Sequence, residues 1–208
     1  MSRCFDDGVQ VIPLTGVKAF LLACNDSLVL VDTGRSEEDV NIILRCIKKL
    51  NKSPKDIELC VITHQHRDHI GGLSKLKEEC DFKVASHKEE SKAIEERTGI
   101  AVDLELEDGQ VLPYCGGTVI VHVPGHTAGN ICLYLKEKGA IIAGDTLFML
   151  EGKLSPPPDQ YCKDPEMARR ELRRLLDLDF DSILVSHGED LWSKGKAELR
   201  KLMERLGY

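Results

Sequence analysis

The sequence lacks any long apolar run. Its longest ones, such as Ala19–Cys24 and Leu28–Val31, are far shorter than the ~20 residues that a membrane-spanning helix needs. The N-terminal segment Met1–Asp7 carries two acids where a secretory signal would place its apolar core. We therefore expect no membrane segment and a cytoplasmic location.

The sequence also lacks a basic excess. Its 28 Lys and Arg residues against 35 Asp and Glu residues give a formal net charge of −7. Because non-specific nucleic-acid binding requires a basic footprint, we do not expect nucleic acid as a partner, although a local basic patch stays open. With 208 residues, 42% apolar and 30% charged, the composition is that of one folded domain over residues 1–208. It leaves the oligomeric state open.

No Cys-x-x-Cys pair occurs among the eight cysteines, which excludes zinc ribbons and thioredoxin-type redox motifs. Several cysteines, such as Cys24 and Cys132, lie inside apolar strand-like runs. We interpret them as small buried apolar residues, while structural disulfides remain the alternative.

No repeat or linker divides the chain, and short β-rich runs alternate with helical patterns. The predicted strands are 9–14, 17–24, 28–32, 59–63, 82–86, 101–104, 110–112, 118–123, 130–135, 140–143 and 182–185. The predicted helices are 36–50, 69–80, 87–97, 164–176 and 193–206. Each half is thus a run of strands with helices between them. This order predicts an α/β fold of two sheets packed face to face with helices outside.

One segment carries most of the chemical information. Directly after the predicted strand 59–63 come four metal-type side chains within six residues: His64, His66, Asp68 and His69. A loop at the end of a strand can direct all four at one point, and imidazole and carboxylate are donors that zinc prefers. Four donors on one loop can also be shared between two ions. We therefore predict a metal site.

Three later residues have the same character. His126, Asp145 and His187 each follow a predicted strand and lie next to a glycine. Alone, each could equally be an ordinary loop residue, but functional residues gather on loops at sheet edges. With the first segment they make seven donors, enough for two metal ions with coordination positions left open.

These segments resemble the sequence motifs of the metallo-β-lactamase-fold hydrolase superfamily, and the resemblance extends from Asp32 to His187. It implies a four-layer αβ/βα sandwich of two mixed β-sheets. It also implies roles for the motif residues: His64, His66 and His126 hold the first ion, Asp68, His69 and His187 hold the second, Asp145 bridges both, and Asp32 orients the ligand loop from outside.

The implied cofactors are two Zn²⁺ per chain, with iron and manganese as alternatives because imidazole and carboxylate suit several metals. Two ions roughly 3.5–4 Å apart lower the pKa of a bridging water and supply hydroxide near neutral pH. That hydroxide attacks a carbonyl carbon or a phosphorus. Asp68 and Asp145 are the catalytic candidates, Asp145 as the bridge and Asp68 for handling the proton.

Two of these positions separate branches of the superfamily. Asp145 stands where secreted β-lactamases usually have Cys or Ser, which resembles the glyoxalase II, lactonase and phosphodiesterase branches. His66 stands where the flavo-diiron branch tends to have Glu, which favours zinc. Only 21 residues follow His187, so we expect no C-terminal glutathione-holding domain. The 41 residues between Asp145 and His187 likewise leave no room for the insertion domain of nucleic-acid-cleaving members.

Few residues are candidates for contacting a small-molecule substrate. Tyr161 could donate a hydrogen bond to a substrate oxygen, as a tyrosine does in lactonase-like members, and Lys163 lies two residues later. Arg67, inside the motif, is a candidate anion contact. For all three the alternative is an ordinary surface residue. The two remaining histidines, His87 and His122, are interpreted as a surface helix residue and a strand residue.

The leading hypothesis is a dinuclear metal-dependent hydrolase of a small ester, thioester or lactone. A phosphodiesterase and an iron-dependent persulfide dioxygenase-like oxidoreductase are the enzymatic alternatives. A metal-binding regulatory protein without activity is the non-enzymatic one, and it is disfavoured because no ligand of the set is missing. The natural substrate stays open.

Overall fold

The computed structural model describes residues 8–24 and 27–208. The segment Met1–Asp7 with Cys4 and the turn Asn25-Asp26, both used above, lie outside the described residues. The chain forms two compact units, residues 1–106 and 107–208. Each unit is described by itself.

The first unit contains a six-stranded sheet in the order β1-β2-β3-β4-β5-β6. Its strands are β1 (Val9–Pro13), β2 (Lys18–Cys24), β3 (Ser27–Val31), β4 (Ile57–Ile62), β5 (Lys83–His87) and β6 (Leu104–Leu106). Strands β1 to β3 form an antiparallel meander, and β3 to β6 are parallel neighbours. Parallel neighbours need crossover connections, and their carboxyl ends meet at one edge of the sheet. The loops after β3, β4 and β5 therefore lie side by side.

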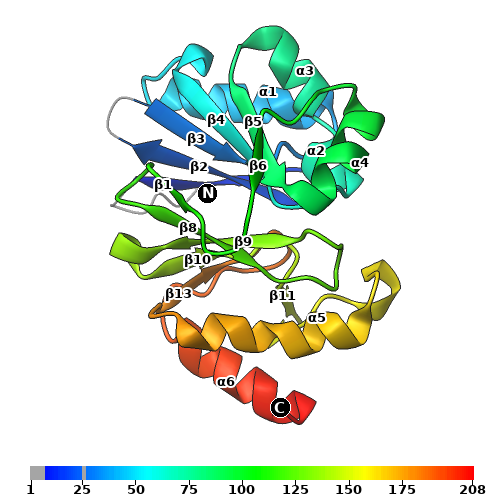
Figure 1. The fold of residues 1–208 in the computed structure, drawn as a ribbon. Coiled ribbons are helices and arrows are strands. Elements are labelled where there is room, and N and C mark those ends of the chain that lie inside the picture. Colours follow the sequence, from blue (N-terminus) through cyan, green and yellow to red (C-terminus); the bar gives the residue numbers. More distant parts are fainter. Residues whose placement is uncertain (1–7, 25–26) are drawn as a thin grey trace. The chain divides into compact units, whose positions relative to one another are not determined.

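Helices provide these crossovers: α1 (Glu37–Lys49), α2 (Arg67–Ile70), α3 (Leu73–Glu79) and α4 (Lys88–Thr98), with a 3₁₀ turn at Pro54–Asp56. Figure 1 shows them on the same side of this sheet. In α1 the buried residues Val40, Ile43 and Ile47 follow helical spacing and share one apolar core with the strands. Full burial of such a side chain contributes about 1.5–3 kcal/mol. The predicted helix over 36–50 is confirmed.

The second unit contains a five-stranded sheet in the order β13-β10-β9-β8-β7. Its elements are β7 (Val111–Leu112), β8 (Thr118–His122), β9 (Ile131–Leu135), β10 (Ala140–Ile142), β13 (Ser182–Leu184), the separate hairpin β11 (Phe148–Leu150) with β12 (Lys153–Ser155), α5 (Pro165–Glu171), α6 (Gly195–Leu206) and 3₁₀ turns at Lys136–Lys138, Asp159–Tyr161 and Leu172–Asp177. Strands β7 to β10 are antiparallel neighbours, whereas β10 and β13 are parallel. Figure 1 shows α5 and α6 on the same side of this sheet. Leu175, Leu199 and Met203 share its apolar core.

Each unit thus has a mixed sheet with helices on one side, which confirms the predicted α/β class with two mixed sheets. Among the described residues, no helix combines the length and apolarity that crossing a membrane requires.

The predicted helix over 69–80 differs from the structure in a way that matters for function. It begins earlier, at Arg67, and is divided into α2 and α3 at Gly71-Gly72. A Cβ atom on Gly71 would lie 2.1 Å from the Arg35 backbone oxygen, and one on Gly72 would lie 2.4 Å from the Thr33 backbone oxygen. The two glycines therefore let α2 pack directly against the loop that follows β3.

Other differences are local. The strand predicted over 101–104 is wrong, since β6 occupies Leu104–Leu106, and the hairpin β11-β12 was not predicted because its strands have only three residues each. His87 is not a surface helix residue: it is 4% exposed, and its Nδ1 accepts a hydrogen bond from the Glu89 backbone N–H at the start of α4. His122 is a half-buried strand residue, as predicted.

The cysteines divide into two groups. Cys46, Cys60, Cys80, Cys132 and Cys162 form no disulfide. Cys132 is fully buried, and burial raises the pKa of its thiol to about 12, as expected for a small apolar core residue. Cys24 is disulfide-bonded, so its interpretation as an unpaired core residue is wrong; Cys115 is disulfide-bonded as well.

Glu171 gives a test of this packing through pH. Hydrogen bonds from Arg174 at 2.7 Å, and then from Arg170 at 2.9 Å, hold the pKa of the buried Glu171 carboxyl below its ordinary value. A lowered folded pKa gives stability that is full above the unfolded pKa and lost as the pH falls through the folded one. We expect Glu171→Gln to lower the free energy of unfolding by about 1–3 kcal/mol at pH 7. The difference should shrink below about pH 4.3.

The measurement is urea unfolding of both proteins between pH 3 and pH 7. Glu166→Gln, which changes an exposed carboxylate on the same helix, is the matched control and should change little at any pH. A Glu171→Gln difference that is equal at pH 3 and pH 7 would contradict the assignment.

Candidate metal centre

Four of the predicted ligands lie together in the first unit, directly after β4. The chain leaves β4 at Ile62, bends at Thr63 and Gln65, and enters α2 after His66; α2 carries Asp68 and His69. The ligand atoms of His64 and His66 lie within 4.8 Å of one another, as do those of Asp68 and His69. The ring centroids of His64 and His69 are 4.0 Å apart, and both side chains are fully buried. The loop thus gathers several imidazole nitrogens in one small region.

Asp32 fixes the orientation of this loop. It follows β3 with a left-handed φ of 61°, which Asp tolerates better than most residues, and it is fully buried. Its Oδ2 lies 2.7 Å from His69 Nδ1. Since a carboxylate only accepts hydrogen bonds, Nδ1 carries the proton and Nε2 is the nitrogen with the lone pair. A carboxylate behind the ring is the usual second partner of a metal-binding histidine.

Thr63 determines in a similar way which nitrogen of His64 carries the proton. The Thr63 hydroxyl donates its single proton to Asp32 Oδ2 at 2.8 Å, and the Thr63 backbone N–H donates to Oδ1 at 2.8 Å. The same hydroxyl oxygen lies 3.1 Å from His64 Nδ1. Because its proton is already committed, His64 Nδ1 must be the donor, and its Nε2 also carries the lone pair. No sequence signal predicts this role of Thr63, apart from its place directly before the motif.

Helix α4 holds the loop from another direction. The Gln65 backbone N–H donates to Glu90 Oε2 at 2.8 Å, and its carbonyl accepts from Arg97 Nη1 at 3.2 Å. Glu90 is fully buried although its side chain ends in a carboxyl group. The residue between the first two histidines is therefore clamped at both of its backbone groups. Sequence reasoning missed this clamp, because it joins segments about 25 residues apart.

The other three predicted ligands lie together in the second unit. Asp145 follows β10 and His187 follows β13, and since these strands are parallel neighbours their carboxyl ends meet at one edge. Asp145 Oδ2 lies 3.4 Å from His126 Nε2, and Asp145 Oδ1 lies 3.3 Å from His187 Nε2. His126 is 2% exposed and Asp145 is 4% exposed. One carboxylate thus presents an oxygen to each of two imidazoles.

This donor chemistry fits a divalent metal. Carboxylate oxygen and imidazole nitrogen are the N and O donors of zinc, iron and manganese sites. A carboxylate with one oxygen toward each ring is the arrangement that a bridging ligand needs.

Neighbouring elements hold His126 and His187 in place. The Phe148 ring on β11 stacks on the His187 ring, with centroids 4.9 Å apart and planes 11° apart. The Met149 backbone N–H donates to the His187 carbonyl at 3.0 Å. On the other side, the Lys163 backbone N–H donates to the His126 carbonyl at 2.9 Å, and Cys162 Sγ lies 3.9 Å from His126 Nδ1. The unpredicted hairpin is therefore a support for a ligand.

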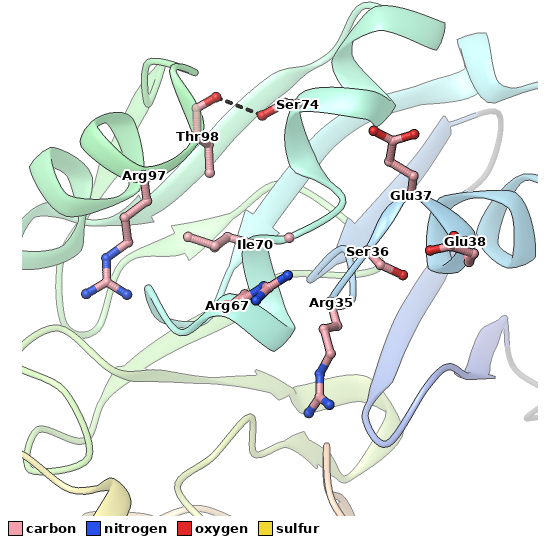
Figure 2. Close-up of a pocket in the computed structure, with 10 residues that line it drawn as sticks. Arg35, Ser36, Glu37, Glu38, Arg67, Ile70, Ser74, Arg97 and Thr98 are labelled. Carbon is pink, nitrogen blue, oxygen red and sulfur yellow. Dashed lines mark hydrogen bonds between the residues drawn. The ribbon is translucent and has the colours of Figure 1, made fainter.

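The predicted substrate contacts are less defined. Tyr161 is 57% exposed in a 3₁₀ turn, and the Lys163 side chain is exposed. Arg67 is exposed on α2 and lines a pocket of about 630 Å³ in the first unit (Figure 2).

Comparison with known proteins agrees with this geometry. A family model described as the metallo-beta-lactamase superfamily matches residues 12–187. The chain belongs to this superfamily. The match includes Asp32 and all seven predicted ligands, so the resemblance inferred from the motifs is confirmed.

Two curated relatives illustrate the range within the family. The chain is 24% identical over 220 residues to the probable metallo-hydrolase YflN of Bacillus subtilis, covering 86% of this chain and 83% of YflN. It is 36% identical over 126 residues to a hydroxyacylglutathione hydrolase of Shewanella oneidensis, covering 57% of this chain and 43% of that enzyme. Several other curated relatives are likewise matched over about half of their length. These relatives support a metal-dependent hydrolase.

The fold is shown by solved structures. A metallo-beta-lactamase from Pontibacter korlensis superposes with a TM-score of 0.80 at 19% identity, covering 98% of both chains. The predicted metallo-β-lactamase fold is therefore confirmed.

The Asp32 arrangement predicts a specific defect. In Asp32→Asn the amide can also donate, so the protonated nitrogen of His69 is no longer fixed. We expect zinc affinity to fall about 10- to 100-fold, measured by competition with a chromophoric chelator. Asp39→Asn is the matched control, because Asp39 is also fully buried in this unit but accepts from the backbone N–H groups of Thr15 and Arg35. An equal loss of affinity in the control would show that general destabilisation, not ring orientation, is responsible.

Proposed function

We propose that the chain is a dinuclear metal-dependent hydrolase that uses two zinc ions and the seven predicted ligands. His64, His66, Asp68 and His69 come from the first unit, and His126, Asp145 and His187 come from the second. The assignment is supported by the donor chemistry of each set and by the family match, which spans both units. Residues 1–208 would then act as one catalytic domain.

The observation that carries the proposal is Asp145. Its two oxygens each face the Nε2 of a different histidine at 3.3–3.4 Å in a nearly buried site. A carboxylate in this position resembles the glyoxalase II, lactonase and phosphodiesterase branches of the family. A relative 36% identical over the matched region is a hydroxyacylglutathione hydrolase, which favours a carbonyl substrate. We therefore propose a small ester, thioester or lactone, hydrolysed in the cytoplasm.

Divalent ions, when bound, lower the pKa of a coordinated water so that it supplies hydroxide near neutral pH, and they polarise the scissile carbonyl. The protein's part is to position and to move protons. Asp32 and Thr63 keep Nε2 of His69 and His64 as the donor nitrogens. Asp68, whose side chain is 21% exposed and whose Oδ2 lies 3.9 Å from Arg35 Nη2, accepts the proton of the nucleophilic water at its carboxylate in this proposal. Tyr161 is the proposed hydrogen-bond donor to the substrate oxygen, with Lys163 nearby in sequence.

The test combines metal analysis with hydrolysis assays. We expect about two zinc ions per chain in the purified protein, and hydrolysis of members of a thioester and lactone panel. Asp145→Asn should lower kcat/KM at least about a hundredfold, because the metals supply several kcal/mol of transition-state stabilisation. Asp179→Asn, which changes an exposed carboxylate shortly before β13, is the control and should retain activity.

Three results would contradict the proposal. A fully loaded protein that hydrolyses no carbonyl substrate would exclude the activity. Hydrolysis of bis(p-nitrophenyl) phosphate instead would indicate a phosphodiesterase. Iron with oxygen consumption would indicate a dioxygenase.

A further inference from the structure

Asn130 is a buried polar residue of the second unit that does not belong to the predicted ligands. It lies directly before β9 and is fully excluded from solvent. Its Nδ2 donates to the Val123 backbone oxygen at 3.1 Å and to Thr146 Oγ1 at 2.7 Å. Because a carbonyl oxygen only accepts hydrogen bonds, the contact with Val123 identifies the amide atom on this side as the nitrogen. Both hydrogens of the amide are thus used.

The first acceptor closes the loop that carries His126. This loop, residues 123–130, connects β8 with β9. The Val123 backbone N–H donates to the Asn130 carbonyl at 2.9 Å, and the Asn130 side chain donates in return to the Val123 carbonyl. Main chain and side chain of Asn130 therefore both hold the base of this loop.

The second acceptor lies directly after Asp145. Thr146 is 2% exposed, and its backbone N–H donates to the Ala143 carbonyl at 3.0 Å in the turn that follows β10. Cys132 Sγ lies 3.1 Å from the Thr146 Oγ1 that also accepts from Asn130. Asn130 and Cys132 are two residues apart, as expected for neighbours on one face of an extended segment. Two side chains at the start of β9 thus hold the residue next to Asp145.

Packing alone does not account for an amide at this position. Within residues 8–24 and 27–208, Asn130 Oδ1 is buried and has no hydrogen-bond partner. A buried acceptor of this kind costs free energy. Leucine has a similar size and would fill the space without that cost. The two hydrogen bonds that Nδ2 donates are therefore what distinguishes asparagine from leucine here.

We propose that Asn130 is a positioning residue that fixes His126 and Asp145 relative to one another. This inference rests on the proposed function, since it takes both residues as metal ligands. His126 Nε2 and Asp145 Oδ2 lie 3.4 Å apart, although they belong to loops that follow different strands. Asn130 is bonded to both loops, at Val123 and at Thr146. A metal site requires ligand positions held within about 0.5 Å, and these two bonds supply that constraint in the second unit.

The first experiment measures metal binding and needs no substrate. Asn130→Leu keeps the size of the side chain and removes both donors. We expect its zinc dissociation constant, measured by competition with a chromophoric chelator, to rise about tenfold, at the lower end of the range for residues behind metal ligands. The visible absorption bands of the cobalt-substituted protein should also shift, because they report ligand geometry.

Thr146 gives a milder version of the same test. Thr146→Val removes only the hydroxyl acceptor, so zinc affinity should fall in the same direction and by no more than in Asn130→Leu. Thr146→Ser keeps the hydroxyl and should bind zinc within about twofold of the wild type. The double variant Asn130→Leu/Thr146→Val should lose no more affinity than Asn130→Leu alone, because both changes break one connection.

Thr118→Val is the matched structural control. Thr118 is 1% exposed at the start of β8, and its hydroxyl donates to the Tyr114 carbonyl at 3.2 Å. This variant also loses a buried hydroxyl of the second unit, but at the end of β8 away from the His126 loop. It should lower the thermal midpoint of the metal-free protein and leave zinc affinity and the cobalt spectrum unchanged.

Two results would overturn the positioning role. One is a folded Asn130→Leu with the zinc affinity and cobalt spectrum of the wild type; if this variant does not fold, the same result in Thr146→Val has the same meaning. The other is a double variant whose loss equals the product of the two single losses.

The proposed function fails in a different way. A wild-type protein that binds zinc and shows the expected changes in its variants, but hydrolyses no carbonyl substrate, would contradict the hydrolase and leave the role of Asn130 intact. A wild-type protein that binds neither zinc nor cobalt would overturn both.

Discussion

The ligand loop of the first unit depends on one buried carboxylate. Asp32 is fully excluded from solvent and would be costly in this position without hydrogen-bond donors. It obtains them from Thr63, through both the backbone N–H and the hydroxyl, and from His69. The same contacts that satisfy the charge set the orientation of two histidine rings. The same hydrogen bonds therefore both stabilise the loop and orient its histidine ligands.

Sheet topology explains why the chemistry gathers where it does. In the first unit β3 and β4 are parallel neighbours, so Asp32 and Thr63 leave the sheet at the same edge. In the second unit the parallel pair β10 and β13 does the same for Asp145 and His187. Each unit has antiparallel strands elsewhere, where consecutive strand ends alternate between edges. The predicted ligands occur after the parallel strands or, for His126, after β8, which is an antiparallel strand of the second unit.

Much of this could be predicted from the sequence because metal ligands are a matter of residue type and local spacing. The four donors between His64 and His69 lie within one loop, and no tertiary information is needed to recognise them. The clamp on Gln65 could not be predicted in this way. It joins a backbone amide to Glu90, and a glutamate in a charged helix looks like a solvated residue until the helix is packed. The hairpin β11-β12 could not be predicted for a related reason. Its three-residue strands are too short to show a periodic pattern, and they are held by pairing with one another and by the contact of Phe148 with His187.

The glycine pair at the end of α2 has a consequence for how this loop can vary. Gly71 and Gly72 lie against the backbone of Arg35 and Thr33 with no space for a side chain, so the path of the loop is set by contacts of main chain with main chain. In the segment from His64 to His69, Gln65 and Arg67 are the two residues that are not proposed metal ligands, and neither of them is buried. Gln65 is held through its backbone, which leaves its side chain unconstrained by that clamp, and Arg67 points to the pocket. The ligand residues and the two glycines must therefore stay constant, whereas the side chains of Gln65 and Arg67 can be exchanged. Substitutions at these two positions can change substrate selectivity without altering the metal ligands.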